Sequence, residues 1–239
     1  MNNVDVSIIL ACYNEGPTLE DSVRRIIAAC QKLRKGWEII FVEDKSTDET
    51  GETVKSLERK IKNSKTIFHK KNMGRGKSVT DGIIAARGDI CGYLDVDLEV
   101  SEKYIPLFVR EIEKGFDMAV GRRFYEKGLA SLTRFLASKI YAFLVNNLLK
   151  VPVSDTEAGY KFFKRSKILP VLLRVGDNHW FWDTEICARA HLSDLSISEI
   201  PVLFTRRTDK KSTVRLVPDT IDYLLAIIRF RNQIGRDFK

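Results

Sequence analysis

The chain has 239 residues, 44% of them hydrophobic and 30% charged, with a formal net charge of +8. This length suits one large α/β domain or two small ones, and the composition excludes a disordered or low-complexity chain. No apolar run is long enough to span a bilayer, and no signal peptide is expected. The positive charge predicts an anionic partner: nucleic acid, a phosphorylated substrate or an acidic membrane surface.

The four cysteines, Cys12, Cys30, Cys91 and Cys187, are scattered along the chain and form no C-x-x-C pair. Their spacing suits neither a zinc site nor a disulfide framework. We therefore expect reduced, mostly buried thiols in a cytoplasmic protein.

The first predicted elements are a strand over residues 4–10 and a helix beginning at Pro17. The strand is a near-continuous apolar run, which is typical of a strand buried on both faces. Thr18 and Asp21 resemble a capping box at the start of the helix, and Gly36 is expected to end it.

Two further strands are predicted over residues 37–42 and 66–68, each followed by polar residues. The helix between them is expected to have Thr47 or Asp48 as its cap. The third strand leads into a basic, glycine-containing loop, residues 70–77, that precedes another helix.

In that loop, Gly76, Lys77 and Ser78 look like the end of a P-loop. The spacing fails, because the first glycine of that motif would fall at Lys71. A basic loop before a helix N-terminus still suits a diphosphate, and an ordinary exposed loop with solvated lysines is an equal alternative.

The fourth predicted strand, residues 90–94, is followed by Asp95, Asp97 and Glu99. In an extended chain, alternate side chains point the same way, so these carboxylates are expected to converge while Val96 faces the opposite side. Converging carboxylates repel one another unless a cation lies between them. Ligands of open α/β sheets bind beyond the carboxyl ends of the strands, so this segment is a candidate metal site. The alternative is a solvated acidic loop.

Strands and helices alternate in this part of the chain, which predicts right-handed βαβ units and a mainly parallel sheet. The polar strand ends, with Tyr13 and Asp44 beside the acidic segment, should lie along one edge. We expect a single domain, residues 1–239, in which a half of about residues 1–121 meets a half of about residues 122–239.

At the end of the first half, a helix is expected after Ser101, with Pro106 kinking it or delaying its start. The strand predicted next, residues 116–120, ends in Arg122 and Arg123, which would face the crevice or form a solvated rim. In the second half, a further strand is predicted over residues 197–204.

Two apolar segments have helical periodicity and basic residues beside them: residues 129–149 and a helix that begins at Pro218. Core helices are one interpretation. The other is amphipathic helices that lie in the headgroup region of a membrane.

The aromatic residues Trp180, Phe181 and Trp182 form either a platform for a sugar or part of the core. His179 is alone and is expected to be structural.

Together these segments resemble the family 2 glycosyltransferases of the GT-A fold, most closely the dolichyl-phosphate mannosyltransferase and polyprenyl-phosphate glucosyltransferase group. The matching segments follow the family order: residues 7–15, 38–50, 72–76, 88–97, 121–123 and 155–163. The resemblance implies a Rossmann-like, mainly parallel sheet flanked by helices, with amphipathic interfacial helices in the C-terminal half. The first half would bind the nucleotide sugar, and the second would face the acceptor and the membrane.

The resemblance also implies the roles of individual residues. The nucleoside of the donor would be held by Ala11, Tyr13, Glu15, Val42 and Asp44. The donor diphosphate and its Mg²⁺ or Mn²⁺ would be held by Asp95, Val96 and Asp97, with Glu99 as a further metal ligand. Phosphates of donor or acceptor would contact Arg123, and the acceptor phosphate would also contact Arg134, Arg207 and Lys211.

The chain departs from the family pattern at several positions. Ala11 and Cys12 replace the more usual Pro-Thr, Glu43 replaces the first of two aspartates, and Thr213 replaces a lysine. The last departure weakens the assignment on the acceptor side.

The implied function is inverting, metal-dependent transfer of mannose or glucose to dolichyl or undecaprenyl phosphate at the cytosolic face of a membrane. GDP-mannose is favoured over UDP-glucose as donor, and the protein would be peripheral, with a membrane-protein partner as one possibility. A hydroxyl acceptor is the alternative, and it would need Asp183 or Glu185 as general base. A non-catalytic protein that binds membranes or nucleic acid ranks last, because no nucleic-acid motif is present.

Overall fold

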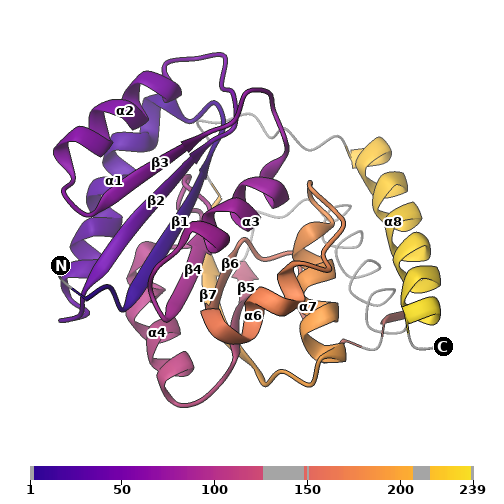
Figure 1. Ribbon diagram of the computed structural model, residues 1–239. Coiled ribbons are helices and arrows are strands. Elements are labelled where there is room, and N and C mark those ends of the chain that lie inside the picture. The colour runs from indigo at the N-terminus through magenta and orange to yellow at the C-terminus, as the bar shows by residue number, and fades with distance from the viewer. Residues whose placement is uncertain (1–2, 126–147, 150, 207–215, 238–239) are drawn as a thin grey trace.

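The computed structural model describes residues 3–125, 148–149, 151–206 and 216–237. Within these residues the fold is a seven-stranded sheet with helices on both faces (Figure 1). The strands are β1 (Val6–Cys12), β2 (Trp37–Glu43), β3 (Ser64–Phe68), β4 (Ile90–Leu94), β5 (Met118–Tyr125), β6 (Tyr160–Lys164) and β7 (Ile197–Phe204). The helices are α1 (Gly16–Gln31), α2 (Thr50–Lys60), α3 (Arg75–Ala85), the 3-10 turn η1 (Glu102–Tyr104), α4 (Ile105–Glu113), α6 (Arg165–Leu172), α7 (Trp182–Leu192) and α8 (Leu216–Asp237).

The strand order is β3-β2-β1-β4-β6-β5-β7. Neighbouring strands are parallel except where β6 pairs with β4 and with β5. The predicted mainly parallel sheet is therefore confirmed. Because β1, β2 and β4 run in the same direction side by side, their carboxyl ends lie on one edge of the sheet.

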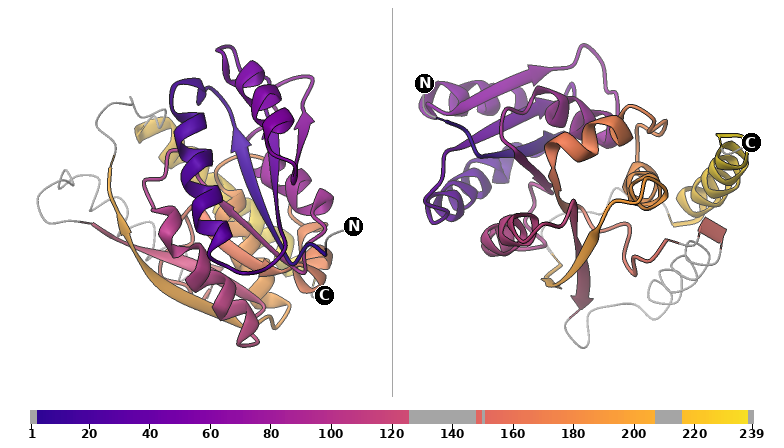
Figure 2. Two further views of the ribbon diagram at one scale, coloured as in Figure 1. Left: turned by 90° about the vertical axis from the view of Figure 1, so that its left-hand side faces the viewer. Right: turned by 60° about the horizontal axis from the view of Figure 1, so that its bottom comes forward.

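Each face of the sheet has its own apolar core. On β1, Ile8 and Leu10 pack with α1, α2 and α4, whereas Ile9 packs with α3, α6 and α7. Figure 2 shows these two layers of helices on opposite sides of the strands. Helix α8 lies outside α7. Its Phe230 ring centroid is 5.8 Å from that of Phe181, the N-cap residue of α7, and 5.0 Å from the guanidinium of Arg189 in α7. Burial on both faces explains the continuous apolar runs of the strands.

Helix α1 differs from its prediction at both ends. It begins at Gly16, and Glu15 is its N-cap residue without a side-chain capping bond. Thr18 is therefore inside the helix and does not cap it, and its hydroxyl donates to the Glu15 carbonyl at 3.5 Å. The helix ends at Gln31, short of Gly36.

Strand β5 is longer than the predicted strand over residues 116–120. It continues to Tyr125 because β7 pairs with it in parallel up to the pair Tyr125 and Phe204. Arg122 and Arg123 consequently lie within a strand and not at its end. The prediction for Pro106 is confirmed, because a 3-10 turn precedes α4 and the proline lies in the first turn of that helix.

Strand β6 and helix α7 have no counterpart among the predicted elements. Every residue from 182 to 190 in α7 is buried, so the helix has no polar face that would reveal its period. In β6, Lys161 is fully buried between aromatic residues and interrupts the apolar run. The described part of the chain contains no helix with the length and hydropathy needed to cross a bilayer.

The four cysteines are free and buried, as expected. The segment of residues 129–149, predicted as helical, lies almost entirely outside the described residues. The C-terminal helix is present as α8, and its residues Ala226, Ile227 and Phe230 are buried while Leu225 and Ile228 are exposed.

Candidate functional site

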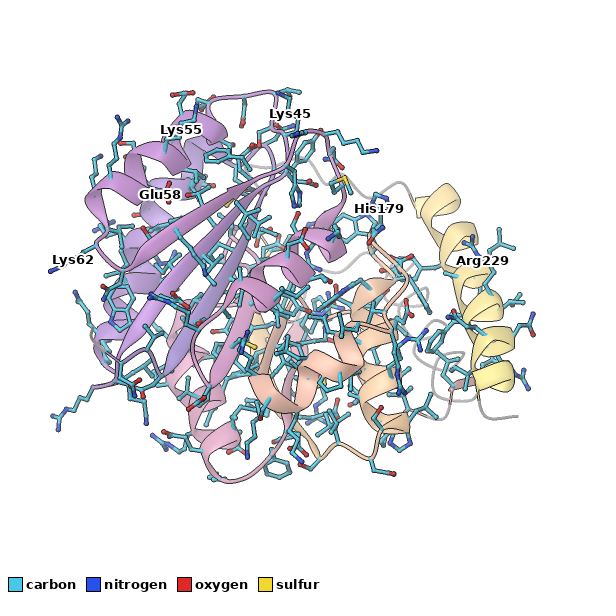
Figure 3. The ribbon with its side chains drawn as sticks, viewed as in Figure 1. Lys45, Lys55, Glu58, Lys62, His179 and Arg229 are labelled. Carbon is cyan, nitrogen blue, oxygen red and sulfur yellow. The ribbon has the colours of Figure 1, made fainter. Side chains whose placement is uncertain are left out.

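The polar ends of β1, β2 and β4 meet at one edge of the sheet, as predicted. Ala11 and Val42 are register partners on β1 and β2, and Tyr13, 44% exposed, follows directly on β1. Figure 3 labels Lys45 at this edge, after β2, and His179 on the loop that precedes α7. The donor-binding residues predicted in the first half therefore lie together at this edge of the sheet, with Val42 and Asp44 buried.

Asp44 is buried at this edge and is bound by the loop before α3. Its Oδ1 accepts from the Met73 N–H at 2.7 Å, and its Oδ2 accepts from the Gly74 N–H at 2.9 Å. His69 Nδ1 lies 2.7 Å from Oδ1, and its Nε2 lies 3.1 Å from Asp81. Asp44 thus fixes the position of this loop, and its predicted contact with the nucleoside stays a prediction.

The acidic segment after β4 forms a turn and not the predicted extended chain. The Leu98 N–H donates to the Asp95 carbonyl at 3.2 Å, Leu98 has a φ of 54°, and the Glu99 N–H donates to Asp97 Oδ1 at 3.2 Å. The extended conformation ends here because β6 pairs with β4 only as far as Leu94. Val96 and Leu98 are nevertheless buried and Asp95 is exposed, so the predicted division between apolar and acidic side chains holds.

Asp97 lies in a strongly negative environment. Burial first, and then the charges of Asp95, Glu99 and Glu15, raise the pKa of Asp97 to about 7. Within the described residues, however, no three His, Cys, Asp or Glu side chains are gathered as a metal cluster. The metal site predicted at Asp95, Asp97 and Glu99 therefore stays a prediction.

The donor set of Asp95 and Asp97 still fits a divalent cation. Carboxylate oxygens are the ligands that Mg²⁺ and Mn²⁺ prefer, and a cation would relieve the repulsion at Asp97. A positive group already contacts Asp95: the Arg75 guanidinium donates to Asp95 Oδ1 from Nε at 2.9 Å and from Nη2 at 2.6 Å. This guanidinium is a cationic stand-in at the acidic segment.

Arg75 is a site residue that was absent from the sequence-based candidates. It is the first residue of α3, and its side chain is only 16% exposed. Its Nη1 donates to Asp183 Oδ2, and its guanidinium lies 5.3 Å from the Tyr93 ring centroid and 5.9 Å from that of Trp180. These contacts hold one cation between two carboxylates and two aromatic rings.

Behind Arg75, Asp183 is bound by a fully buried lysine. Lys161 Nζ donates to Asp183 Oδ1 at 2.6 Å, to the Tyr93 hydroxyl at 3.0 Å and to the Ala158 carbonyl at 2.5 Å, which uses all three of its protons. The Tyr93 hydroxyl in turn donates to Asp183. We call Lys161, Asp183, Arg75 and Asp95 the charged row, because their charges alternate from the core to the surface.

The predicted role of Asp183 as a general base has no support in this environment. Burial opposes its charge, but Arg75 and Lys161 outweigh burial and hold the pKa of Asp183 below its ordinary value. A carboxylate with both oxygens bound to cations is poorly suited to accept a proton. The other candidate base, Glu185, is also buried and accepts from the N–H groups of Gly176 and Asp177.

The glycines before and in α3 allow close packing. Gly74 has a φ of 97°, and a Cβ at Gly76 would lie 2.5 Å from Trp182 Cβ. The Lys77 N–H donates to the Asn178 carbonyl at 3.0 Å, so the loop before α7 lies directly against the first turn of α3. This packing, and not a P-loop, accounts for the glycine spacing.

Of the two interpretations of residues 180–182, a sugar platform or part of the core, the core interpretation is confirmed for two of the three residues. Trp182 is fully buried, and its Nε1 donates to Thr80 Oγ1 at 2.9 Å. Phe181 is 5% exposed and belongs to the core. Trp180, 44% exposed, remains on the surface beside Arg75.

Arg123 forms a second cluster of charges with Asp155. Asp155 Oδ2 accepts from the Arg123 backbone N–H at 3.0 Å and from its Nε at 2.8 Å, and Oδ1 accepts from Nη2 at 2.8 Å. Glu157 lies 3.7 Å from Nη2. The predicted phosphate contact of Arg123 stays a prediction, and the three other predicted acceptor residues, Arg134, Arg207 and Lys211, lie outside the described residues.

The sequence is similar to known glycosyltransferases. The model of the family "Glycosyl transferase family 2" matches residues 7–169. Over 231 residues the chain is 32% identical to glycosyltransferase AglD of Haloferax volcanii. This match covers 95% of this chain and 37% of that protein. Over 216 residues it is 30% identical to undecaprenyl-phosphate 4-deoxy-4-formamido-L-arabinose transferase of Salmonella paratyphi A, which covers 89% of this chain and 64% of that protein. The chain thus spans less than two thirds of these relatives.

Solved structures with a similar fold include two glycosyltransferases. Mannosyl-3-phosphoglycerate synthase of Rubrobacter xylanophilus has a TM-score of 0.68 at 16% identity, over 98% of this chain and 75% of that one. Glucosyl-3-phosphoglycerate synthase of Mycobacterium tuberculosis, solved with Mn²⁺ and UDP, has a TM-score of 0.70 at 17% identity, over 95% and 80%. At these identities the likeness shows the fold alone, and that fold is GT-A.

Proposed function

The chain belongs to glycosyltransferase family 2, and on this basis we propose that it transfers a hexose from a nucleotide-diphosphate sugar to a polyprenyl phosphate. The observation that carries the proposal is the meeting of Tyr13, Asp95, Asp97 and Arg75 at the carboxyl edge of a parallel sheet. An aromatic ring, an acidic pair and a cation at one edge suit a nucleoside diphosphate. The Salmonella relative, whose name states transfer to undecaprenyl phosphate, supports the choice of acceptor.

On the donor side, we propose that the nucleoside lies over the ends of β1 and β2. Tyr13 and Glu15 would contact it from one strand, and Asp44 would lie next to the base. Ala11 and Val42, paired across the two strands, would form the floor of that subsite. We propose GDP-mannose before UDP-glucose as the donor, because the sequence most closely resembles the dolichyl-phosphate mannosyltransferase group.

Asp95 and Asp97 would hold a divalent cation, Mg²⁺ or Mn²⁺, at the donor diphosphate, with Glu99 as a further ligand. Such an ion acts as a Lewis acid that neutralises charge on a leaving diphosphate. Asp97 is suited to this role because its neighbours and its burial disfavour its charged form until a cation compensates it.

On the acceptor side, a polyprenyl phosphate is already an anion and needs cations to position it more than a base to activate it. Arg123 would contribute one cation, and Arg134, Arg207 and Lys211 are the other proposed contacts. In-line attack of the phosphate oxygen on the anomeric carbon would invert that centre. A hydroxyl acceptor fits less well, because neither Asp183 nor Glu185 is free to accept its proton.

We place the protein at the cytosolic face of a membrane as a peripheral protein, bound directly or through a membrane protein. On α8, Leu225 and Ile228 are exposed, and Arg229 and Arg231 follow on the same helix (Figure 3). Apolar side chains flanked by arginines suit an anionic lipid surface. Flotation with vesicles that contain or lack anionic lipid tests this placement, and equal binding to both would contradict it.

The activity is tested by incubating the protein with undecaprenyl or dolichyl phosphate, MnCl₂ and labelled GDP-mannose, UDP-glucose or other nucleotide sugars. We expect label in the organic phase with at least one donor, and its loss in Asp97→Asn. Glu52→Gln, an exposed acid on α2, is the matched control and should remain active. Labelling of a soluble acceptor with no labelled lipid would contradict the proposed acceptor.

A further inference from the structure

Arg75 is the third of the four residues in the charged row. The row begins at Lys161, which is fully buried, and ends at Asp95, whose side chain is 47% exposed. Three of its members are thus fixed inside the protein, and the last one opens to solvent. An ion pair that ends in solvent can exchange its outer partner at lower cost than a buried one.

The guanidinium of Arg75 divides its donors between these two sides. Nη1 is bound to Asp183, and the opposite edge, Nε and Nη2, is bound to a single oxygen of Asp95. The ring of Tyr93 lies against the same group. If Asp95 left, Arg75 would keep Asp183 and Tyr93, and its Nε–Nη2 edge would be free in the geometry that binds a phosphate by two parallel hydrogen bonds.

We propose that Arg75 and a divalent cation compete for Asp95, and that the released edge of Arg75 binds the diphosphate of the nucleotide. Without a cation, Arg75 neutralises Asp95. When a cation binds, Asp95 turns to it, and the diphosphate replaces Asp95 at the Nε–Nη2 edge. This inference rests on the proposed function for the identity of the ligand.

Charge explains why the two binding events should be coupled. A divalent cation alone would place a positive ion next to Arg75, which disfavours its binding. A diphosphate supplies the negative charge that compensates both cations. Binding of the cation and of the nucleotide should therefore each strengthen the other, by the same factor.

The Asp95 carboxylate and the Arg75 guanidinium both lie close to the backbone of Gly159. A Cβ at Gly159 would lie 2.0 Å from Asp95 Oδ2 and 2.4 Å from Arg75 Nη2, so only glycine leaves room there. The Asp95 N–H also donates to the Gly159 carbonyl at 3.1 Å, which fixes the backbone while the side chain turns.

The test measures binding of MnCl₂ alone, by titration calorimetry or by the paramagnetic resonance signal of free Mn²⁺. Arg75→Gln should bind Mn²⁺ at least about fivefold more tightly than the wild type, because its competitor is gone. Arg75→Lys keeps a charge that reaches only one carboxylate at a time, so its affinity should be intermediate. Arg24→Gln is the matched control: this arginine pairs with Asp21 on the exposed side of α1 and its variant should behave as the wild type.

The second arm measures GDP and UDP with Mn²⁺ present. Arg75→Gln should bind the nucleotide at least about tenfold more weakly than the wild type, whereas Arg24→Gln should not. Unchanged or weaker Mn²⁺ binding by Arg75→Gln, or unchanged nucleotide binding, would overturn the exchange. If the wild type bound neither nucleotide, the proposed donor class would fail, while the Mn²⁺ arm would still decide whether Arg75 competes for Asp95.

Discussion

Two arginines of this protein bind carboxylates in opposite ways. Arg123 presents its backbone N–H, Nε and Nη2 to Asp155, with Glu157 farther away at 3.7 Å, and the side chains of Arg123 and Asp155 are 18% and 16% exposed. Arg75 divides its donors between Asp183, which is buried, and Asp95, which is half-exposed. The first arrangement is a closed pair, and the second is an open row.

The two arrangements differ in how far their charges are exposed. In the closed pair, the Nε–Nη2 edge of Arg123 is bound by one carboxylate, so the pair fixes β5 against the segment before β6. In the open row, the inner charges are buried and the outer one is half-exposed, which is the basis of the exchange proposed for Arg75. The same two residue types thus form a closed pair in one place and a pair open to solvent in the other.

The largest expected effect is on the inner part of the charged row. Asp183→Asn leaves the fully buried Lys161 without its anion, and we expect the free energy of unfolding to fall by about 3–5 kcal/mol. Urea denaturation followed by circular dichroism measures this loss. The double variant Asp183→Asn/Lys161→Met should recover part of it, because no buried charge is then unpaired.

Asp21→Asn is the matched control, since Asp21 pairs with Arg24 on the exposed side of α1. Its free energy of unfolding should stay within about 0.5 kcal/mol of the wild type. A loss of less than about 1 kcal/mol in Asp183→Asn would equal that of an exposed ion pair. It would show that the buried pair of Lys161 and Asp183 does not stabilise the charged row.

The closed pair should show a smaller loss. Arg123→Met leaves Asp155 with only the backbone N–H as donor, and we expect a loss of about 2 kcal/mol in the free energy of unfolding. The adjacent Arg122 is exposed over the Phe124 ring, and Arg122→Met should have little effect by the same denaturation assay. Equal losses in the two variants would remove the distinction between a closed pair and a surface arginine.

Much of the sheet could be predicted from the sequence, because strands that are buried on both faces have continuous apolar sequences. Strand β4 begins and ends as predicted, and so does β7. Helix α7 could not be predicted in this way, since it is buried all round and has no polar stripe. The alternation of acidic and apolar residues identified the acidic segment. Its turn could not be predicted, because it depends on where β6 stops pairing with β4, which is a feature of the tertiary structure.

The charged row could not be predicted, because its members are far apart in sequence. Arg75 and Asp183 are separated by 108 residues, and in the sequence Arg75 is one of several basic residues in a loop. Lys161 within an aromatic run was the available signal. A lysine in a strand that is otherwise apolar must be paired when it is buried, and this requires an acidic partner from another segment.

A third carboxylate beside the closed pair makes stability depend on pH. Burial first, with the charges of Asp155 and Asp183 added and Arg123 opposing, raises the pKa of Glu157 to about 7. The folded protein therefore binds this proton more tightly than the unfolded chain, whose glutamate pKa is about 4.3. The resulting stability is fully present below the unfolded pKa and is lost as the pH rises through about 7.

Glu157→Gln should remove this dependence and make the protein more stable than the wild type at pH 8. We expect a gain of about 1 kcal/mol at that pH, because the Glu157 side chain is still 28% exposed and solvent reduces the effect of its burial. Thermal unfolding at pH 5 and pH 8 measures the difference between the two proteins. A constant difference across that range would mean that Glu157 titrates alike in the folded and unfolded states.

The aromatic rings beside the two arginines should contribute least to stability and binding. Trp180 lies over Arg75 in the open row, and Phe204 lies 5.8 Å from the guanidinium of Arg123 in the closed pair. Trp180→Leu should change the free energy of unfolding by only about 0.5 kcal/mol, because the ring is 44% exposed and contributes as a surface cation–π contact. It should weaken binding of the nucleotide with Mn²⁺ by about twofold, the equivalent of the same energy, because Arg75 loses one of the two rings that orient it. Phe204→Leu should leave that binding unchanged, since Arg123 keeps all its bonds to Asp155, and equal effects of the two variants would contradict an open site at Arg75.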